Sequence, residues 1–165
     1  MLRQNDLDII YISDNICTDP SLECLMQKPE QMVFVANKHH PLAGKQALPI
    51  SGLLDYPFVV TEPAGRCYHT LLGLVAGQGK ALNYSVMVND IGAISVLLRD
   101  RCSLSFLPRA AVNGSLGTGD VAVLDVSVPP QIYYSQILVR KSMWRSPALE
   151  HLVSVIKQTA ERDRE

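Results

Sequence analysis

The stretch QMVFVAN at residues 31–37 decides the fold class. Its middle, MVFVA, is a run of apolar residues with no polar position between them. A strand with one face in water alternates polar and apolar side chains, so an unbroken apolar run predicts a strand that is buried on both faces. Such strands belong to parallel or mixed sheets covered by helices. The stretch therefore predicts an α/β fold.

The segments on either side alternate between strand and helix patterns, which predicts a largely parallel α/β sheet. Strands are expected at residues 7–13, 57–61, 82–88, 104–107, 121–126 and 132–140. Helices are expected at residues 66–77, at 91–99 and from Pro147 onward, with a helical turn at 51–55 and a glycine-rich loop at 113–120. Asp90 (or Asn89) and Ser146 stand where N-cap residues are expected.

Composition limits the class of protein. The chain has 165 residues, of which 47% are hydrophobic and 19% are charged, so it can bury one core and form two lobes. Its net charge is −1. Because neutralisation of phosphates dominates DNA affinity, a domain that held DNA alone would carry a basic surplus. These residues are therefore not expected to contact DNA themselves.

The sequence predicts a cytoplasmic protein with no membrane association. Its four cysteines, Cys17, Cys24, Cys67 and Cys102, form no C-x-x-C pair, and a chain of this size does not need disulfides to stabilise its core. The opening MLRQNDLD lacks the basic and apolar regions of a secretion leader. No apolar run approaches the ~20 residues of a membrane span.

Four segments carry a family resemblance. Leu7-Asp8 begins an apolar run, and the apolar strand at residues 32–36 precedes His40-Pro41-Leu42-Ala43. Residues 90–108 start with an aspartate and end in Leu-Pro, and LVRK at 138–141 precedes SPA at 146–148. In this order, over nearly the whole chain, they resemble the effector-binding domain of LysR-type transcriptional regulators.

The resemblance implies a type-II periplasmic-binding-protein-like fold, with two α/β lobes, mixed and mostly parallel sheets, and a ligand cleft between the lobes. Residues 1–13 and 133–165 would be remnants of an incomplete lobe one, and residues 14–132 would be lobe two. The DNA-binding winged helix would be absent. The family has glycines where this chain has Arg101 and Ser103. We expect strain at Arg101, since glycine supplies a left-handed helix cap more easily.

Two strand–helix junctions are candidate effector-binding segments. Ser13 and Asp14 follow the first strand and resemble the place where family members offer a hydroxyl to their effector. The junction at residues 61–66 offers backbone N–H groups and a guanidinium that could clamp a carboxylate. The expected binding residues are Ser13, Asp14, Thr61, Glu62, Ala64 and Arg66. Alternatively, Ser13 and Thr61 are turn residues and Arg66 is a solvated charge.

Glu62 bears on the charge of the effector. Its carboxylate would repel an anionic ligand at this junction, which favours a neutral, zwitterionic or cationic effector unless the side chain faces away.

Cys67 offers an alternative function. Gly65-Arg66-Cys67 resembles the Gly-His-Cys around the reactive cysteine of the family's peroxide sensors. Arg66 and a helix N-terminus would lower the pKa of the thiol, as a sensing thiolate requires. Those sensors have a resolving cysteine nine residues later, where this chain has Ala76. A buried, inert thiol is therefore the default expectation.

Binding, and not catalysis, is the expected activity. His39, His40, His69 and His151 show no metal-ligand spacing and are expected as surface residues, and we expect no cofactor. An enzyme would require a polar constellation that the sequence lacks. The resemblance implies a small-molecule effector and a dimer or tetramer, with DNA contacted only through the missing N-terminal domain. The effector would act by population shift. A transport-type solute-binding protein of the same fold is a second alternative.

Overall fold

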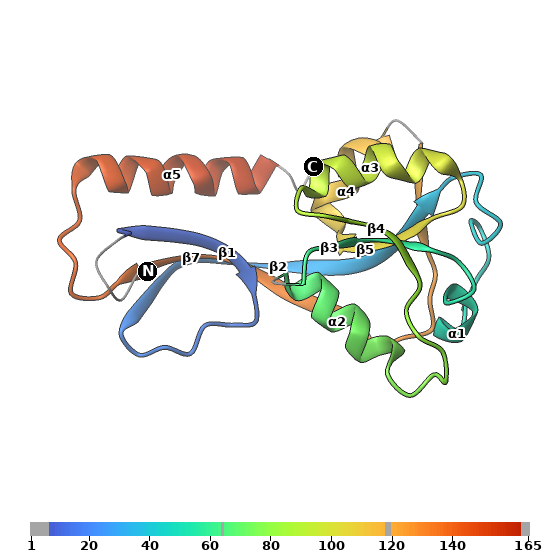
Figure 1. Ribbon diagram of the computed structural model, residues 1–165. Helices are drawn as coiled ribbons and strands as arrows, with labels where there is room; N and C mark the ends of the chain where they lie inside the picture. Colours follow the sequence, from blue (N-terminus) through green and yellow to red (C-terminus); the bar gives the residue numbers. More distant parts are fainter. Residues whose placement is uncertain (1–6, 64, 118–119, 163–165) are drawn as a thin grey trace. The chain divides into compact units, whose positions relative to one another are not determined.

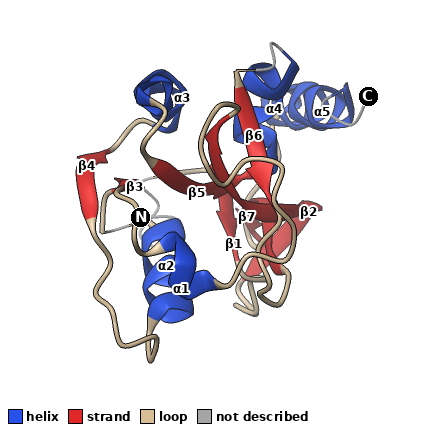
Figure 2. Cartoon of the chain, turned by 90° about the vertical axis from the view of Figure 1, so that its right-hand side faces the viewer, coloured by secondary structure: helices blue, strands red, loops and turns tan. Residues whose placement is uncertain are grey.

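The computed structural model describes residues 7–63, 65–117 and 120–162. The chain divides into two compact units, the first formed by residues 1–30 and 132–165 and the second by residues 31–131. Strands and helices alternate along the chain (Figures 1 and 2). The expected lobe boundaries, after residues 13 and 132, differ in position from this division, and the assignment of segments to lobes stays a prediction. No helix in the described part of the chain combines the length and apolar character of a membrane span.

The first unit is a small sheet with one helix. It contains β1 (Ile9–Asp14), the first part of β2 (Leu22–Asn37), β7 (Gln131–Arg140) and α5 (Pro147–Arg162). β7 lies between β1 and β2, and β1 pairs antiparallel with it, from Ile9 opposite Val139 to Asp14 opposite Tyr134. The predicted cap of α5 is confirmed, because Ser146 Oγ accepts the N–H of Leu149 at 3.2 Å.

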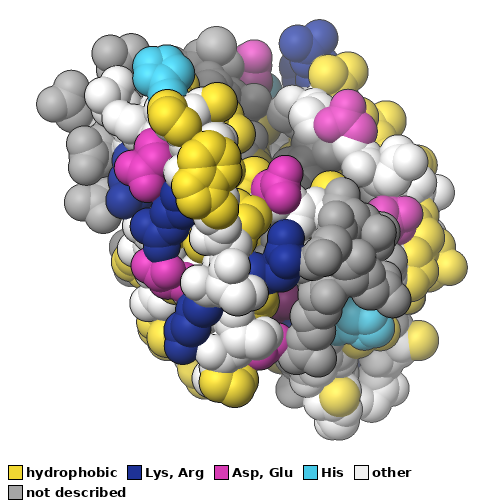
Figure 3. All heavy atoms as spheres, turned by 90° about the vertical axis from the view of Figure 1, so that its left-hand side faces the viewer, with side chains coloured by type: hydrophobic (Ala, Val, Ile, Leu, Met, Phe, Trp, Pro, Cys, Tyr) yellow, Lys and Arg dark blue, Asp and Glu magenta, His cyan; other side chains and the backbone are white. Residues whose placement is uncertain are grey.

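Helix α5 buries only part of its apolar surface. Val153 and Ala160 are buried, and Leu149 and Ile156 are half-buried. Leu152 is 45% exposed. It lies one residue before Val153, so the helix turns it about 100° away from the sheet. Trp144 and Val155 are exposed too, and Figure 3 shows apolar side chains at the surface among charged ones.

The second unit is a mixed sheet in the order β6-β2-β5-β3-β4. Its strands besides β2 are β3 (Phe58–Thr61), β4 (Tyr84–Val88), β5 (Leu104–Pro108) and β6 (Val121–Leu124). β2 pairs antiparallel with β5 on one side and with β6 on the other, whereas β3 is parallel to both β4 and β5. The predicted burial of MVFVA is confirmed, since residues 32–36 are all buried.

Strand β2 is longer than predicted. We expected it to start at residue 31, but it starts at Leu22. Pro29 has no N–H to donate to a sheet and ordinarily marks an edge or a strand end, so the sequence pattern placed the boundary after it. Residues 22–28 are not fully buried, which removes the continuous apolar signal seen in residues 32–36.

Helices cover both faces of the second sheet. α3 (Ile91–Leu97), its 3₁₀ extension η2 (Leu98–Asp100) and α4 (Arg109–Gly117) lie on one face, and α1 (Ile50–Leu53) and α2 (Arg66–Val75) on the other (Figure 1). The predicted N-cap of α3 is confirmed, because Asp90 Oδ1 accepts the N–H of Gly92 at 2.8 Å.

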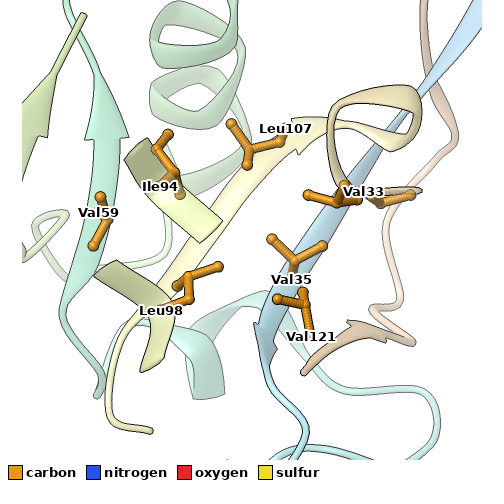
Figure 4. Packing of buried hydrophobic residues seen from close by; sticks show 8 residues of the cluster. Val33, Val35, Val59, Ile94, Leu98, Leu107 and Val121 are labelled. Atoms are coloured by element: carbon orange, nitrogen blue, oxygen red, sulfur yellow. The ribbon is translucent and has the colours of Figure 1, made fainter. Parts of the chain in front are cut away.

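The core under α3 and α4 is a single apolar cluster, part of which is labelled in Figure 4. Its members come from strands β2, β3, β5 and β6 and from the two helices: Val33, Val35, Val59, Ile94, Leu98, Leu107, Val112 and Val121. Each is at most 6% exposed. Packing in this cluster explains why the prediction of a loop at residues 113–120 is wrong.

That segment begins as helix and not as loop. α4 extends to Gly117, and residues 118–119 lie outside the described part. Gly114 and Gly117 lower helix propensity, which favoured a loop in the sequence. However, Ala110 and Ala111 are strong helix formers, and Val112 is 1% exposed in the core cluster. Tertiary packing of this kind outweighs local propensity.

The turn after β2 contains a buried histidine. His40 is 3% exposed, which contradicts its expected place on the surface. Its Nδ1 accepts the N–H of Leu42 at 3.1 Å, and its Nε2 lies 3.3 Å from the carbonyl oxygen of Cys102. This pattern requires a neutral ring that carries its proton on Nε2. Tyr56 packs edge-on against the ring at a centroid distance of 4.6 Å.

The turn at Arg101 is strained, as predicted. Arg101 has φ 63°, in the left-handed region that favours glycine. The preceding Asp100 fixes this turn, since its Oδ1 accepts the N–H groups of Cys102 at 2.9 Å and Ser103 at 3.0 Å. Its Oδ2 accepts the Ser103 hydroxyl at 2.7 Å. Partial burial opposes the charge, but these hydrogen bonds outweigh it and lower the pKa of Asp100.

The neutral His40 predicts a pH-dependent stability. Burial lowers the pKa of His40 below its ordinary value of 6.5, although the Cys102 carbonyl and Asp100 oppose the shift and Lys45 supports it. The unfolded chain therefore binds more protons, so stability is full above pH 6.5 and falls as the pH drops below that value. We expect urea unfolding to give a lower free energy at pH 5.5 than at pH 7.5.

A substitution tests whether His40 causes this loss of stability at low pH. His40→Asn should cost about 1–3 kcal/mol at pH 7.5, because it leaves buried groups without partners. It should also flatten the pH dependence. His39→Asn is the matched control, since His39 is exposed in the same turn. An equal loss of stability on acidification in wild type and His40→Asn would contradict the assignment.

Candidate functional site

The junction between β3 and α2 is a tight turn. Thr61 ends β3 opposite Val88 of β4, and the next residue, Glu62, donates its N–H to the Val88 carbonyl at 3.0 Å. The N–H of Gly65 then donates back to the carbonyl of Glu62 at 2.9 Å. Helix α2 begins at Arg66 immediately afterwards. The backbone of Thr61 and Glu62 is thus fixed at the end of the sheet.

No side chain of the described residues caps the N-terminus of α2. Its N-cap is Gly65, with φ −82° and ψ 140°, and no acidic residue stands in the first turn. The first N–H groups of a helix have no partner within the helix, and the helix dipole places partial positive charge there. Side chains of Asp, Ser or Thr usually accept these hydrogen bonds. This helix end is therefore suited to an acceptor from outside the chain.

A buried hydroxyl lies against this turn. Thr61 Oγ1 is buried and has no hydrogen-bond partner among the described residues. A Cβ atom added to Gly65 would lie 3.3 Å from Thr61 Oγ1 and 3.2 Å from the carbonyl oxygen of Glu62. Buried polar groups are almost always hydrogen-bonded, and those that are not tend to mark functional sites. The Thr61 hydroxyl is thus a candidate ligand contact.

The structure brings three of the predicted residues together at this turn. Thr61, Glu62 and Arg66 all belong to it; Glu62 and Arg66 are exposed and Thr61 is half-buried. Ala64, also predicted, lies outside the described residues. Exposure of Glu62 places its carboxylate in water, where its charge opposes an anionic ligand less than a buried carboxylate would.

Cys67 is the second residue of α2 and is half-buried. Burial raises the pKa of its thiol, although a hydrogen bond from its own backbone opposes the shift. This is the reverse of the direction expected from Arg66 and the helix N-terminus. A thiol with a raised pKa is protonated at neutral pH and is a poor nucleophile. All four cysteines are free.

Ser13 and Asp14 lie together in the first unit, at the end of β1. They pair with Ser135 and Tyr134 of β7. Ser13 is exposed, and Asp14 is half-buried and accepts the N–H of Asn15 at 2.6 Å. The hydroxyl of Ser13 is thus accessible at the point where the chain leaves the sheet.

Gln136 holds the chain that follows Asp14. It is fully buried in β7, its Oε1 accepts the N–H of Cys17 at 2.8 Å, and its Nε2 donates to the carbonyl of Asn15 at 2.9 Å. Gln136 was not among the residues predicted from the sequence. One signal was available, since Gln136 is an amide directly before the apolar run ILV of a predicted strand.

The two groups of predicted residues belong to different compact units, and each is described by itself. Neither includes a metal-ligand set. Within residues 7–63, 65–117 and 120–162, no three His, Cys, Asp or Glu side chains gather as ligands of a metal ion would.

Solved structures of known proteins share the fold of this chain. The regulatory domain of CcmR from Synechocystis PCC6803, solved in complex with 2-PG, has a TM-score of 0.79 and 17% sequence identity, covering 96% of this chain and 76% of that one. The effector-binding domain of QuiR in complex with shikimate has a TM-score of 0.70 and 20% identity, covering 90% of this chain and 69% of that one. The fold is thus the type-II periplasmic-binding-protein-like fold expected from the sequence.

Sequence comparison identifies the family. The RuBisCO operon transcriptional regulator of Allochromatium vinosum is 23% identical over 151 residues, which are 90% of this chain. The chain spans about half of that regulator's length, 49%. The family described as the LysR substrate binding domain matches residues 1–161. The chain belongs to the LysR substrate-binding domain family.

Proposed function

We propose that this chain is the effector-sensing domain of a LysR-type transcriptional regulator. Support comes from the turn between β3 and α2, where a buried hydroxyl that has no partner among the described residues lies beside a helix N-terminus that no described side chain caps. Thr61 can donate a hydrogen bond there, and the first N–H groups of α2 can donate others. Such donors, gathered in one turn, suit an oxygen-rich small molecule.

The charge of the effector follows from the same turn. The sequence favoured a neutral, zwitterionic or cationic effector because of Glu62. The first turn of α2 has no acidic residue, Glu62 is exposed, and Arg66 adds a positive charge. We propose that the effector places a carboxylate or another anionic oxygen group at this helix end. The CcmR and QuiR structures, in complex with 2-PG and shikimate, support a small-molecule effector.

The Ser13–Cys17 segment is our proposed second contact. Gln136 fixes the backbone of this segment through Asn15 and Cys17. The exposed Ser13 hydroxyl and the Asp14 carboxylate therefore have defined positions at the end of β1. Gln136 is a positioning residue in this scheme and does not touch the effector. A ligand shifts a conformational equilibrium only if its affinity for the two states differs.

The output would be transcription control in the cytoplasm, where bacterial DNA lies. With a net charge of −1, the chain suits effector binding better than DNA binding, and DNA would be contacted through a separate N-terminal domain of the regulator. We propose binding without catalysis, because the polar groups of the two segments are placed as hydrogen-bond partners and not as a nucleophile and base. A solute-binding protein of the same fold is the alternative, and it would bind ligand without altering transcription.

Thr61→Val tests the effector site. Valine keeps the shape of the side chain and removes the partnerless hydroxyl, so the thermal midpoint should hold or rise. Affinity for the effector should fall about 3- to 10-fold, the value of one neutral hydrogen bond. Calorimetric titration with 2-PG, shikimate and related small acids would measure both proteins. Thr159→Val is the matched control, since Thr159 is an exposed residue of α5. Equal affinity in Thr61→Val and wild type would refute the role of this hydroxyl.

Peroxide reactivity tests the alternative function as a thiol sensor. Because burial raises the pKa of Cys67, its thiol should react with hydrogen peroxide no faster than the exposed Cys24 and Cys102. Mass spectrometry of a peroxide time course would give the rate at each cysteine. A Cys67 rate at least ~10-fold above the other two would favour the redox sensor instead.

Self-association is expected through β1. Among the described strands, β1 pairs with β7 alone, so its other edge can pair with another chain. Tyr11 on this strand is 53% exposed. Light scattering across a concentration series should show a dimer or larger species, and Tyr11→Lys should weaken it, since a charge on an edge strand discourages pairing. A monomer at every concentration would count against this interface.

A further inference from the structure

A hollow in the 31–131 unit is lined mainly by basic side chains. It has a volume of about 370 Å³ and is lined by Asn37, Lys38, His39, Arg99, Arg101 and Asp120, which we call the Arg101 pocket. It lies where the end of β2, the η2 turn and the start of β6 meet.

This pocket is separate from the β3–α2 turn. Ala36, near the end of β2, pairs with Leu104, the first residue of β5, and Leu104 pairs with Phe58, the first residue of β3. The Arg101 pocket is therefore level with the beginning of β3. Thr61 is the last residue of that strand, so the two sites lie at opposite ends of the sheet.

Hydrogen bonds fix the backbone around the pocket. The N–H of Lys38 donates to the carbonyl of Asp120 at 3.1 Å, and the N–H of His39 donates to Asn37 Oδ1 at 3.0 Å. His40 Nε2 joins the same turn to the carbonyl of Cys102. The basic side chains thus extend from a framework that is already ordered, which lowers the entropic cost of binding.

The pocket carries a local positive charge on a chain whose net charge is −1. Lys38, Arg99 and Arg101 are exposed cations, and Asp120 is the carboxylate in the lining. The neighbouring Asp100 directs its oxygens to Cys102 and Ser103. Three cations outnumber the Asp120 and Asp100 carboxylates at this pocket, which favours an anionic ligand.

The backbone conformation of Arg101 also supports a ligand site at this pocket. This residue has φ 63°, where glycine would be unstrained and a side chain is not. The Asp100 hydrogen bonds hold the strained turn in place. Strain kept at a residue whose side chain lines a pocket indicates a function for that side chain.

We propose that the Arg101 pocket binds a small phosphate-bearing anion, namely inorganic phosphate or a phosphate monoester. The planar guanidinium groups of Arg99 and Arg101 suit two-point hydrogen bonding to phosphate oxygens. A nucleic acid would require a basic stripe along an extended surface. Lys38, Arg99 and Arg101 gather in one hollow beside Asp120, which suits a small ligand better.

Calorimetric titration with sodium phosphate, against sodium chloride of matched ionic strength, tests the proposal. Wild type should show saturable binding of phosphate. Arg101→Gly should weaken it at least about tenfold, the value of a charged hydrogen bond. Its thermal midpoint should stay equal or rise, since glycine relieves the strain. The same titration with glycerol 3-phosphate distinguishes the two ligands. Tighter binding of glycerol 3-phosphate than of phosphate would indicate a monoester, and the reverse would indicate the free ion.

Two further variants make the test decisive. Arg99→Ala should weaken phosphate binding as well, and it replaces Arg101→Gly if that protein does not fold. Lys80→Ala should bind like wild type, since the Lys80 ammonium is already paired with Asp55. The proposal is overturned if phosphate gives no more heat than chloride, or if both arginine variants bind like wild type. A loss in Thr61→Val without a loss in Arg101→Gly would place the phosphate at the effector turn and also overturn it.

Discussion

Strand β2 is hydrogen-bonded to neighbouring strands along much of its length, and its pairing organises the sheet. The strand runs from Leu22 to Asn37, and both compact units include part of it. In the second unit it is paired on both edges, as Phe34 shows by standing opposite Phe106 of β5 and Leu124 of β6. A strand enclosed in this way can present only apolar side chains to the helices above and below. That requirement accounts for MVFVA and for the apolar core cluster.

Polar groups in the second unit fall into two kinds. The Asp100 carboxylate accepts three hydrogen bonds and holds the turn around Arg101, and His40 uses both ring nitrogens. These groups are satisfied within the chain and have structural roles. Thr61 Oγ1 is buried without a partner among the described residues, beside a helix end that no side chain caps. This contrast separates a binding group from a structural one, and it makes the β3–α2 turn the candidate site.

Local sequence patterns predicted the helices and strands. They did not reveal contacts between residues that are far apart in the sequence. The apolar run of β2 and the caps at Asp90 and Ser146 depend on neighbours in sequence, so they were foreseen correctly. The burial of His40 depends on Cys102, 62 residues away, and the role of Gln136 depends on Cys17, 119 residues away. Helix α4 was missed for a similar reason, since packing in the core outweighs its glycines. At the candidate site, sequence located the turn, but the unpartnered hydroxyl required the structure.

Amide NMR can show whether the β3–α2 turn binds the effector. Two-dimensional ¹⁵N spectra recorded during titration with 2-PG and other small acids would follow each backbone N–H. Saturable shifts are expected at Glu62, Gly65, Arg66 and Cys67, because those amides belong to the turn or to the first residues of α2. Saturable binding whose shifts leave these four amides unchanged would contradict binding at this turn.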